Sequence, residues 1–501
     1  MGLLRDSSKI FTGQVIQRLI SVLLIPITAR LIGPDDYGIV QAATSVFAIA
    51  AVFGSFALEA SIPVAESEIN ALQRAVGTIF IGMIFSLIFG FISYILKPFI
   101  LNYLSVKITL VIIFLSPVYI TLMVATISLQ NYVGYLGKFT YFPIADVSSL
   151  IAGFLALLSS YFFLWQDYRC LILGGITTFV TKLCIYFYAT RGHRKFHFEK
   201  GTTVKEIRDS IWSARNFAKY NFPANLLNSS SANLPITLIS MFFAESVVGL
   251  FAMARSIIYI PTQLSGQALG QVFYPKASKA YREGKGLKDI TWRTFIYSCQ
   301  MALYPSLLIG TSAWFVLPLI LGPKWSGIGL YCLLILPMVL FNAVQTQIGI
   351  GFIFSIINQQ HKILIGNIGL FIGRFLPLLI CVILFASPYI AVFAHSMGGA
   401  VIYILLLVWV FITVSINPVE AFYVWLKYTL ISLMCVAPIG LSIILPHNVI
   451  LLSFSLTLSI ILYASIGWFQ FLSAKQRSII LNEMHKLFPF LKKVKSMVSL
   501  A

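Results

Sequence analysis

Residues 76–95 read VGTIFIGMIFSLIFGFISYI, twenty consecutive positions without a charged side chain. A helix of about 20 apolar residues spans the hydrocarbon core of a bilayer. Comparable runs recur along the whole chain, of whose 501 residues 59% are hydrophobic and only 10% are charged. Lipid admits only helices or closed barrels, and the alternating ten-residue segments of a barrel are absent. The sequence therefore predicts an all-α polytopic membrane protein.

The apolar runs predict about fourteen membrane-spanning helices. An even number of spans places both termini on the same side of the membrane. The expected spans lie at roughly 7–32, 37–62, 76–103, 106–130, 141–165, 168–190, 219–243, 246–272, 292–321, 326–355, 361–385, 388–415, 422–446 and 448–472.

The distribution of basic residues predicts the orientation. Of the 35 Lys and Arg residues, 26 lie in the even-numbered connections and the two tails, and five lie in or near the odd-numbered connections. Because basic loops stay in the cytoplasm, both termini are expected there. The net charge of +19 then reflects orientation in the membrane, and nucleic acid is not an expected partner.

The chain is expected to form two six-helix lobes followed by two additional helices. A basic stretch between spans six and seven carries Val204, Ile207 and Ile211 at helical spacing, which predicts an amphipathic helix at the membrane interface. The expected units are an N-terminal lobe (1–190), a cytoplasmic linker with that helix (191–218), a C-terminal lobe (219–415), two additional helices (416–473) and a cytoplasmic amphipathic basic tail (474–501).

Three landmarks of the first half recur in the second half at an offset of 209 to 212 residues. Pro26 corresponds to Pro235, Gly38 to Gly249 and Pro63 to Pro275. Because six spans separate the copies, they share one orientation, which is the parallel-repeat arrangement of some transporters. Chance similarity between apolar segments is the alternative interpretation.

Four cations lie inside predicted spans: Arg18, Lys182, Arg255 and Arg374. A charge at that depth is costly unless it faces a wet cavity or a partner. The sequence therefore predicts a site for an anion within the membrane. Structural ion pairing is the alternative, and Lys182 is close enough to its span end to snorkel.

Uncharged polar side chains accompany these cations on the same helices. Gln14 shares a face with Arg18, since four residues make just over one helical turn, and Asn367 shares a face with Arg374, since seven residues make nearly two turns. Such side chains could contact sugar hydroxyls or simply join helices. The expected substrate-binding residues are Arg18, Arg255, Arg374, Lys182, Gln14, Asn367, Gln263, Gln267, Asn225 and Asn228.

Three titratable residues are candidates for ion coupling. Glu59 and Asp146 lie near cytoplasmic span ends, where a structural partner for a cation is the competing interpretation. His395 lies in span twelve and titrates near neutral pH when unperturbed, although a lone histidine in a bundle is commonly just hydrogen bonded. The six cysteines lack metal spacing and no phosphate-binding loop occurs, so no metal, cofactor or enzymatic activity is expected.

Residues 11–14 (FTGQ), 29–38 (ARLIGPDDYG) and 273–276 (FYPK) resemble Wzx-type polysaccharide flippases. These belong to the superfamily that also contains multidrug extruders and lipid II flippases. The resemblance implies a V-shaped pair of lobes. It also implies transfer of a polyprenyl-pyrophosphate-linked oligosaccharide between leaflets of the bacterial cytoplasmic membrane, for O-antigen, capsule or exopolysaccharide.

Arg18 and Arg30 match cationic positions in the first helix of related flippases. That helix carries fewer arginines here than in lipid II flippases, which argues against lipid II as the substrate. Membrane lipids, a polysaccharide polymerase and chain-length proteins are the other implied partners.

Two other functions compete with this one. A multidrug or metabolite extruder of the same fold would favour buried acids over buried arginines when it exports organic cations. A membrane-embedded polysaccharide polymerase or ligase would need a substantial outer loop, and the predicted outer loops are short.

Overall fold

The computed structural model describes residues 2–191, 203–284, 286–440 and 449–471. Within these residues the regular structure is entirely helical. Twelve helical segments among them are long and apolar enough to cross a membrane. Helices α1 (Gly2–Leu31) and α10 (Arg215–Phe242) are 30 and 28 residues long but more polar. The twelve segments and these two helices match the fourteen expected spans, and the all-α polytopic fold is confirmed.

The first six spans pack largely as neighbouring pairs, α3 with α5 and α6 with α7, and α1 lies against α6. Two short helices, η1 (Leu58–Ser61) and α4 (Lys97–Ile100), connect them. After α1, the long helices of this half are α2 (Pro34–Ser55), α3 (Glu68–Ile95), α5 (Val106–Tyr135), α6 (Tyr141–Phe163) and α7 (Tyr168–Ala189).

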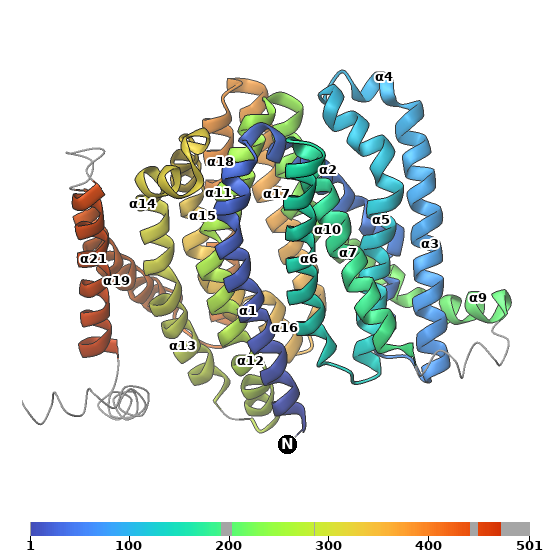
Figure 1. Ribbon diagram of the computed structural model, residues 1–501. Helices are drawn as coiled ribbons and strands as arrows, with labels where there is room; N and C mark the ends of the chain where they lie inside the picture. Colours follow the sequence, from blue (N-terminus) through green and yellow to red (C-terminus); the bar gives the residue numbers. More distant parts are fainter. Residues whose placement is uncertain (1, 192–202, 285, 441–448, 472–501) are drawn as a thin grey trace, which may run out of the picture.

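The second half contains more interrupted helices. A π-helical segment, η2 (Cys299–Leu303), joins α13 to α14, and a break at Gly349 separates α15 from α16. After α10 its helices are α11 (Glu245–Ile258), α12 (Ile260–Arg282), α13 (Leu287–Ser298), α14 (Tyr304–Leu321), α15 (Ile328–Ile348), α16 (Ile350–Ile356), α17 (Gln360–Phe385) and α18 (Pro388–Thr413). The final helices, α19 (Pro418–Val436) and α21 (Val449–Ile466), lie at one edge of the bundle (Figure 1).

The two ends of the bundle are distinguished by short helices. Helix α1 begins at the same end as α9 (Val204–Ser213), whereas α4 lies at the opposite end (Figure 1). We call these the α9 end and the α4 end. Helix α2 contacts α10 and α11 and thereby joins the first six spans to the second half.

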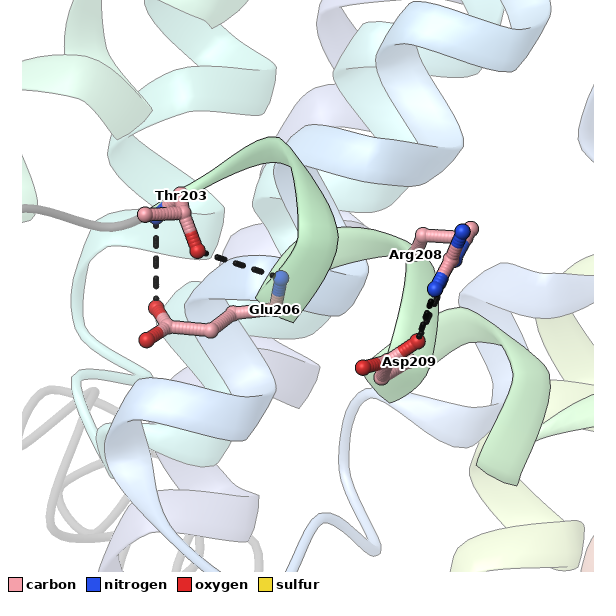
Figure 2. A network of polar contacts seen from close by, with 4 residues as sticks. All are labelled: Thr203, Glu206, Arg208 and Asp209. Atoms are coloured by element: carbon pink, nitrogen blue, oxygen red, sulfur yellow. Dashed lines mark hydrogen bonds and ion pairs between the residues drawn. The ribbon is translucent and has the colours of Figure 1, made fainter.

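The amphipathic helix expected in the linker is present as α9. It begins with a capping box, in which the Thr203 hydroxyl accepts from the Glu206 backbone N–H and the Glu206 carboxylate accepts from the Thr203 N–H (Figure 2). Arg208 pairs with Asp209 on its exposed side at 3.2 Å (Figure 2). Most of the remaining linker, and the tail expected at 474–501, lie outside the described residues.

Helix α9 packs two of its apolar side chains, Ile207 and Ile211, against the protein, whereas Val204 is 84% exposed. A Cβ atom on Gly77 of α3 would overlap the Ile211 side chain and would lie 2.9 Å from Ile207 Cγ2, so the glycine makes room for both isoleucines. Arg74 donates to the Ser61 carbonyl at 2.8 Å and to the Ser213 hydroxyl at 3.3 Å. The isoleucines expected to face lipid therefore pack on α3, because the glycine offers them a closer apolar contact.

Candidate functional site

Two of the four predicted intramembrane cations meet at one turn of α10. Arg255 of α11 donates from Nη1 to the Ala232 carbonyl at 2.6 Å. Arg374 of α17 donates from Nη1 to the Ser231 hydroxyl at 3.2 Å. Since Ser231 and Ala232 are adjacent, the two guanidinium groups lie within electrostatic range of each other. We call Arg255 and Arg374 the arginine pair.

A proline lies one turn beyond these two acceptors in α10. Pro235 lies inside α10 and has no N–H, so the Ser231 carbonyl four residues earlier lacks its usual helical donor. The proline ring also pushes the preceding turn open. The acceptors used lie beside that carbonyl: Arg374 donates to the Ser231 hydroxyl and Arg255 to the Ala232 carbonyl.

Tyr403 of α18 fixes the orientation of Arg374. Its hydroxyl accepts a hydrogen bond from Arg374 Nη2 and a second one, at 2.5 Å, from Asn342 Nδ2 of α15. The guanidinium carbon also lies 5.0 Å from the centroid of the Tyr403 ring, within the range of a cation–π contact. Three helices thus determine where the Arg374 charge lies.

Glycines bring Arg374 against α18. A Cβ atom on Gly398 would overlap the Gly373 carbonyl, and one on Gly373 would lie 3.2 Å from the Gly398 carbonyl oxygen. The two backbones are therefore in direct contact, as at other small-residue crossings in membranes. A Cβ atom on Gly399 would lie 3.4 Å from Arg374 Cγ, so the arginine stem runs along the glycine surface of α18.

His395 forms a hydrogen bond with the backbone of Arg374. It is buried in α18, and its Nδ1 lies 3.0 Å from the Arg374 carbonyl oxygen. A carbonyl only accepts, so Nδ1 carries the hydrogen in this contact. The histidine is thus hydrogen bonded within the bundle, and its coupling role stays a prediction.

The arginine pair has only neutral partners among the described side chains. The ion pairs among the described residues involve neither arginine. They are Arg169–Asp167, Lys182–Asp146, Arg208–Asp209 and Lys279–Glu283. The Arg374 Nε atom is buried and has no hydrogen-bond acceptor within the described residues. Two charges held by carbonyl and hydroxyl groups leave a net positive site, which an anion would neutralise.

Lys182 lies elsewhere and has a carboxylate of its own. Its ammonium group is 2.6 Å from Asp146 Oδ1, which joins α7 to α6, and both side chains are largely buried. This is the ion-pair arrangement that the sequence left open for Asp146. The substrate role of Lys182 and the coupling role of Asp146 stay predictions.

Arg18 does not join the arginine pair. It is half-buried on α1, and no described side chain forms a hydrogen bond or ion pair with it. Its helix packs on α6, where a Cβ atom on Gly13 would overlap Pro143.

The remaining predicted polar residues are dispersed. Asn225 and Asn228 are exposed on α10, and Gln263 and Asn367 are half-buried on α12 and α17. The side chains of Gln14 and Gln267 lie outside the described set. Glu59 lies in η1, and its Oε2 atom is buried without a hydrogen-bond partner in the described structure.

Sequence reasoning missed Tyr403, Ser231 and Arg74. Tyr403 follows His395 and Gly399 at intervals of four residues, and that stripe could have been read as one face of α18. Ser231 contributes its hydroxyl and not the carbonyl that Pro235 frees, so no sequence signal pointed to it. Arg74, counted among the loop cations, is 7% exposed and ties α3 to η1 and α9.

The sequence also matches a protein family across the region that contains the first arginine of the pair. A family model described as "Polysaccharide biosynthesis protein" matches residues 27–329, which is more than half of the chain. The chain belongs to this family. The resemblance noted in residues 29–38 and 273–276 is thereby confirmed at the level of the family. A comparison with curated proteins finds no match.

Solved structures show that this family member has a transporter fold. It superposes on the lipid II flippase MurJ in an inward closed conformation with a TM-score of 0.68 and 14% identity, covering 91% of this chain and 97% of that one. An inward-facing multidrug resistance MATE family transporter of the MOP superfamily gives a TM-score of 0.54 and 14% identity, covering 80% and 98%. At such identity the likeness establishes the fold alone. Both structures are transporters and neither is an enzyme.

Proposed function

We propose that this protein is a flippase that moves a polyprenyl-pyrophosphate-linked oligosaccharide from the inner to the outer leaflet of the bacterial cytoplasmic membrane. The product would serve assembly of a surface polysaccharide such as O-antigen, capsule or exopolysaccharide. The observation that carries the proposal is the arginine pair, two guanidinium groups on predicted spans whose partners among the described residues are all neutral. Guanidinium stays charged when dehydrated and binds phosphate through two parallel hydrogen bonds.

The arrangement of the pair suits a pyrophosphate. Arg255 and Arg374 approach from different helices and are both anchored on α10, so a diphosphate could be held between two fixed donors. Asn342 and Tyr403 adjoin Arg374 and would present amide and hydroxyl groups to the first sugar. Arg18, on the other lobe, would meet the substrate only after the lobes rearrange.

The proposal includes two lobes, at 1–190 and 219–415, that rock about their contact. It places the α9 end in the cytoplasm, in agreement with the excess of basic residues there. Re-orientation of the headgroup would follow from separation of α2 and α11 near the α4 end.

A multidrug extruder is the second candidate, because the MATE transporter shares the fold. The arginine pair disfavours this function for organic cations, since an export site for a cation requires negative charge or aromatic faces. Ethidium transport in proteoliposomes distinguishes the two candidates.

The test of the proposed function measures undecaprenyl pyrophosphate binding to the purified full chain. Arg255→Gln and Arg374→Gln remove one charge each while keeping an amide of similar length. Each is expected to weaken binding at least tenfold, because a charge-assisted contact is lost. The matched control is Lys107→Gln, an exposed cation at the start of α5. Equal binding by all four proteins, or saturable ethidium transport without pyrophosphate binding, would overturn the proposal.

A further inference from the structure

The ends of α1 and α14 cap one another at the α4 end. Arg30, in the last turn of α1, donates from Nε to the Ile320 carbonyl and from Nη2 to the Leu319 carbonyl, each at 2.9 Å. In return, Trp325 Nε1 donates to the Ala29 carbonyl at 2.8 Å. The last carbonyls of a helix lack intrahelical donors, so each helix receives them from the other half of the chain.

Arg30 and Lys324 each extend across this junction to the connection on the opposite side. A Cβ atom on Gly322 would lie 3.8 Å from Arg30 Cγ, and one on Gly33 would lie 3.8 Å from Lys324 Cδ. The stem of each cation therefore lies over a glycine of the opposite connection, and both side chains are exposed. Among the described residues neither cation forms an ion pair, and the exposed Asp35 nearby pairs with neither.

An apolar groove of about 550 Å³ lies beside Arg30 between α1 and α14. Its surface is formed by aliphatic side chains from both helices, several of them exposed in a part of the bundle that faces the bilayer. Apart from Arg30, the lining residues are Pro26, Ile27, Leu31, Leu319 and Ile320. A cationic rim above an aliphatic groove has the chemistry of a phospholipid, whose phosphate and acyl chain are adjacent.

We propose that this groove binds one anionic phospholipid from the leaflet at the α4 end. Its phosphate contacts Arg30 and Lys324, and an acyl chain lies along the groove. Arg30 can hold a phosphate without leaving the α14 carbonyls, because its Nη1 atom forms no hydrogen bond with the described residues. The bound anion neutralises two cations whose stems both lie at the α1–α14 junction. This site is independent of the substrate that the protein moves.

The purified full chain is titrated with phosphatidylglycerol, and native mass spectrometry measures how many lipid molecules stay bound and how strongly the tightest one is retained. Lys324→Gln removes an exposed charge that forms no ion pair with the described residues, and Arg30→Gln removes the second charge. Each is expected to weaken retention of the tightest phosphatidylglycerol about tenfold. Lys107→Gln, an exposed cation at the same end, is the matched control and should retain the lipid as the unaltered protein does.

Two outcomes would overturn the inference. One is equal phosphatidylglycerol retention by Lys324→Gln, Arg30→Gln and Lys107→Gln. The other is retention of undecaprenyl phosphate but not phosphatidylglycerol, which would make the groove part of the substrate path. Since no transport is measured, failure of the proposed flippase function would not affect this result.

Discussion

Gly38 and Gly249 contact each other's helix by a reciprocal arrangement. A Cβ atom on Gly38 would overlap the Glu245 carbonyl and lie 2.9 Å from the Gly249 nitrogen, and one on Gly249 would overlap the Pro34 carbonyl and lie 3.0 Å from the Pro34 Cα. Residues 34 and 245, like residues 38 and 249, are 211 positions apart. Gly38 contacts residue 245, and Gly249 contacts residue 34. Such an exchange of equivalent contacts is the pattern of a local two-fold axis. The crossing of α2 and α11 is thus the structural counterpart of the repeat read from the sequence.

Substitution of either glycine is expected to disrupt this crossing. Gly38→Ala or Gly249→Ala forces two backbones apart and should cost about 2–3 kcal/mol or more, as overpacking does. Thermal unfolding of the purified variants measures the loss. Gly351→Ala is the control, because a Cβ atom there meets nothing within 4 Å. Unchanged melting temperatures for the Gly38 and Gly249 variants would contradict the described contact.

Tyr403→Phe tests whether the orientation of Arg374 matters for the proposed pyrophosphate site. The ring and its cation–π contact remain, while the acceptor shared by Arg374 and Asn342 is removed. Undecaprenyl pyrophosphate affinity should fall about tenfold, and stability should fall by about 1–3 kcal/mol because two donors lose their acceptor. The exposed Tyr423, changed to Phe, provides the comparison. Full affinity in Tyr403→Phe would mean that the hydroxyl does not position the arginine.

The Lys182–Asp146 pair is expected to behave as a coupled unit. Each single change, Lys182→Met or Asp146→Asn, leaves one largely buried group without its partner. The double variant should be more stable than the sum of the two losses predicts, by about 1–2 kcal/mol. Chemical denaturation measures this coupling energy. Strict additivity would show that the pair contributes nothing beyond its separate side chains.

Glu59 should make stability depend on pH. Burial raises the pKa of this carboxyl above its ordinary value, and the contact with Ser55 opposes that change more weakly. The native state then binds the proton more tightly than the unfolded state. Its stabilising effect is full below the unfolded pKa and is lost as the pH rises through the raised pKa.

Glu59→Gln therefore mimics the protonated form. Its melting temperature should exceed that of the unaltered protein at alkaline pH, and the difference should shrink as the pH falls toward the ordinary pKa of a glutamate. The exposed Glu66, in the same connection, is changed to Gln as the control. A difference that is constant with pH would show that Glu59 does not titrate in this range.

Much of the fold could be predicted because lipid imposes it. A helix that crosses a bilayer must be long and apolar. Residues 76–95 could therefore be identified as a membrane span without information about which helices pack against them. The correspondence between Gly38 and Gly249 could also be seen in the sequence, because helices that cross at close backbone contact need a small residue at the crossing point. The periodicity of the linker also indicated a helix where α9 lies, but it did not show that Ile207 and Ile211 pack at Gly77, because nothing near them in sequence points to that residue.

The candidate site was predictable only in part. Arg255 and Arg374 were selected because charge is rare in spans, and the structure brings both to α10. The same criterion selected Arg18, which lies apart from them, and Lys182, which pairs with Asp146. The position of a cation within a predicted span indicates that it needs a partner or a wet cavity, but it does not identify that partner.

The sequence by itself determined the class of the protein, the number of its spans and the positions of its deep charges, because each follows from the free energy of placing a side chain in lipid. Tertiary structure alone decided which charges meet, which one a carboxylate neutralises, and how Tyr403 and the α10 turn orient Arg374. Those relationships join α10 with α11, α17 and α18, and α6 with α7, and their distances depend on helix packing that no local pattern encodes.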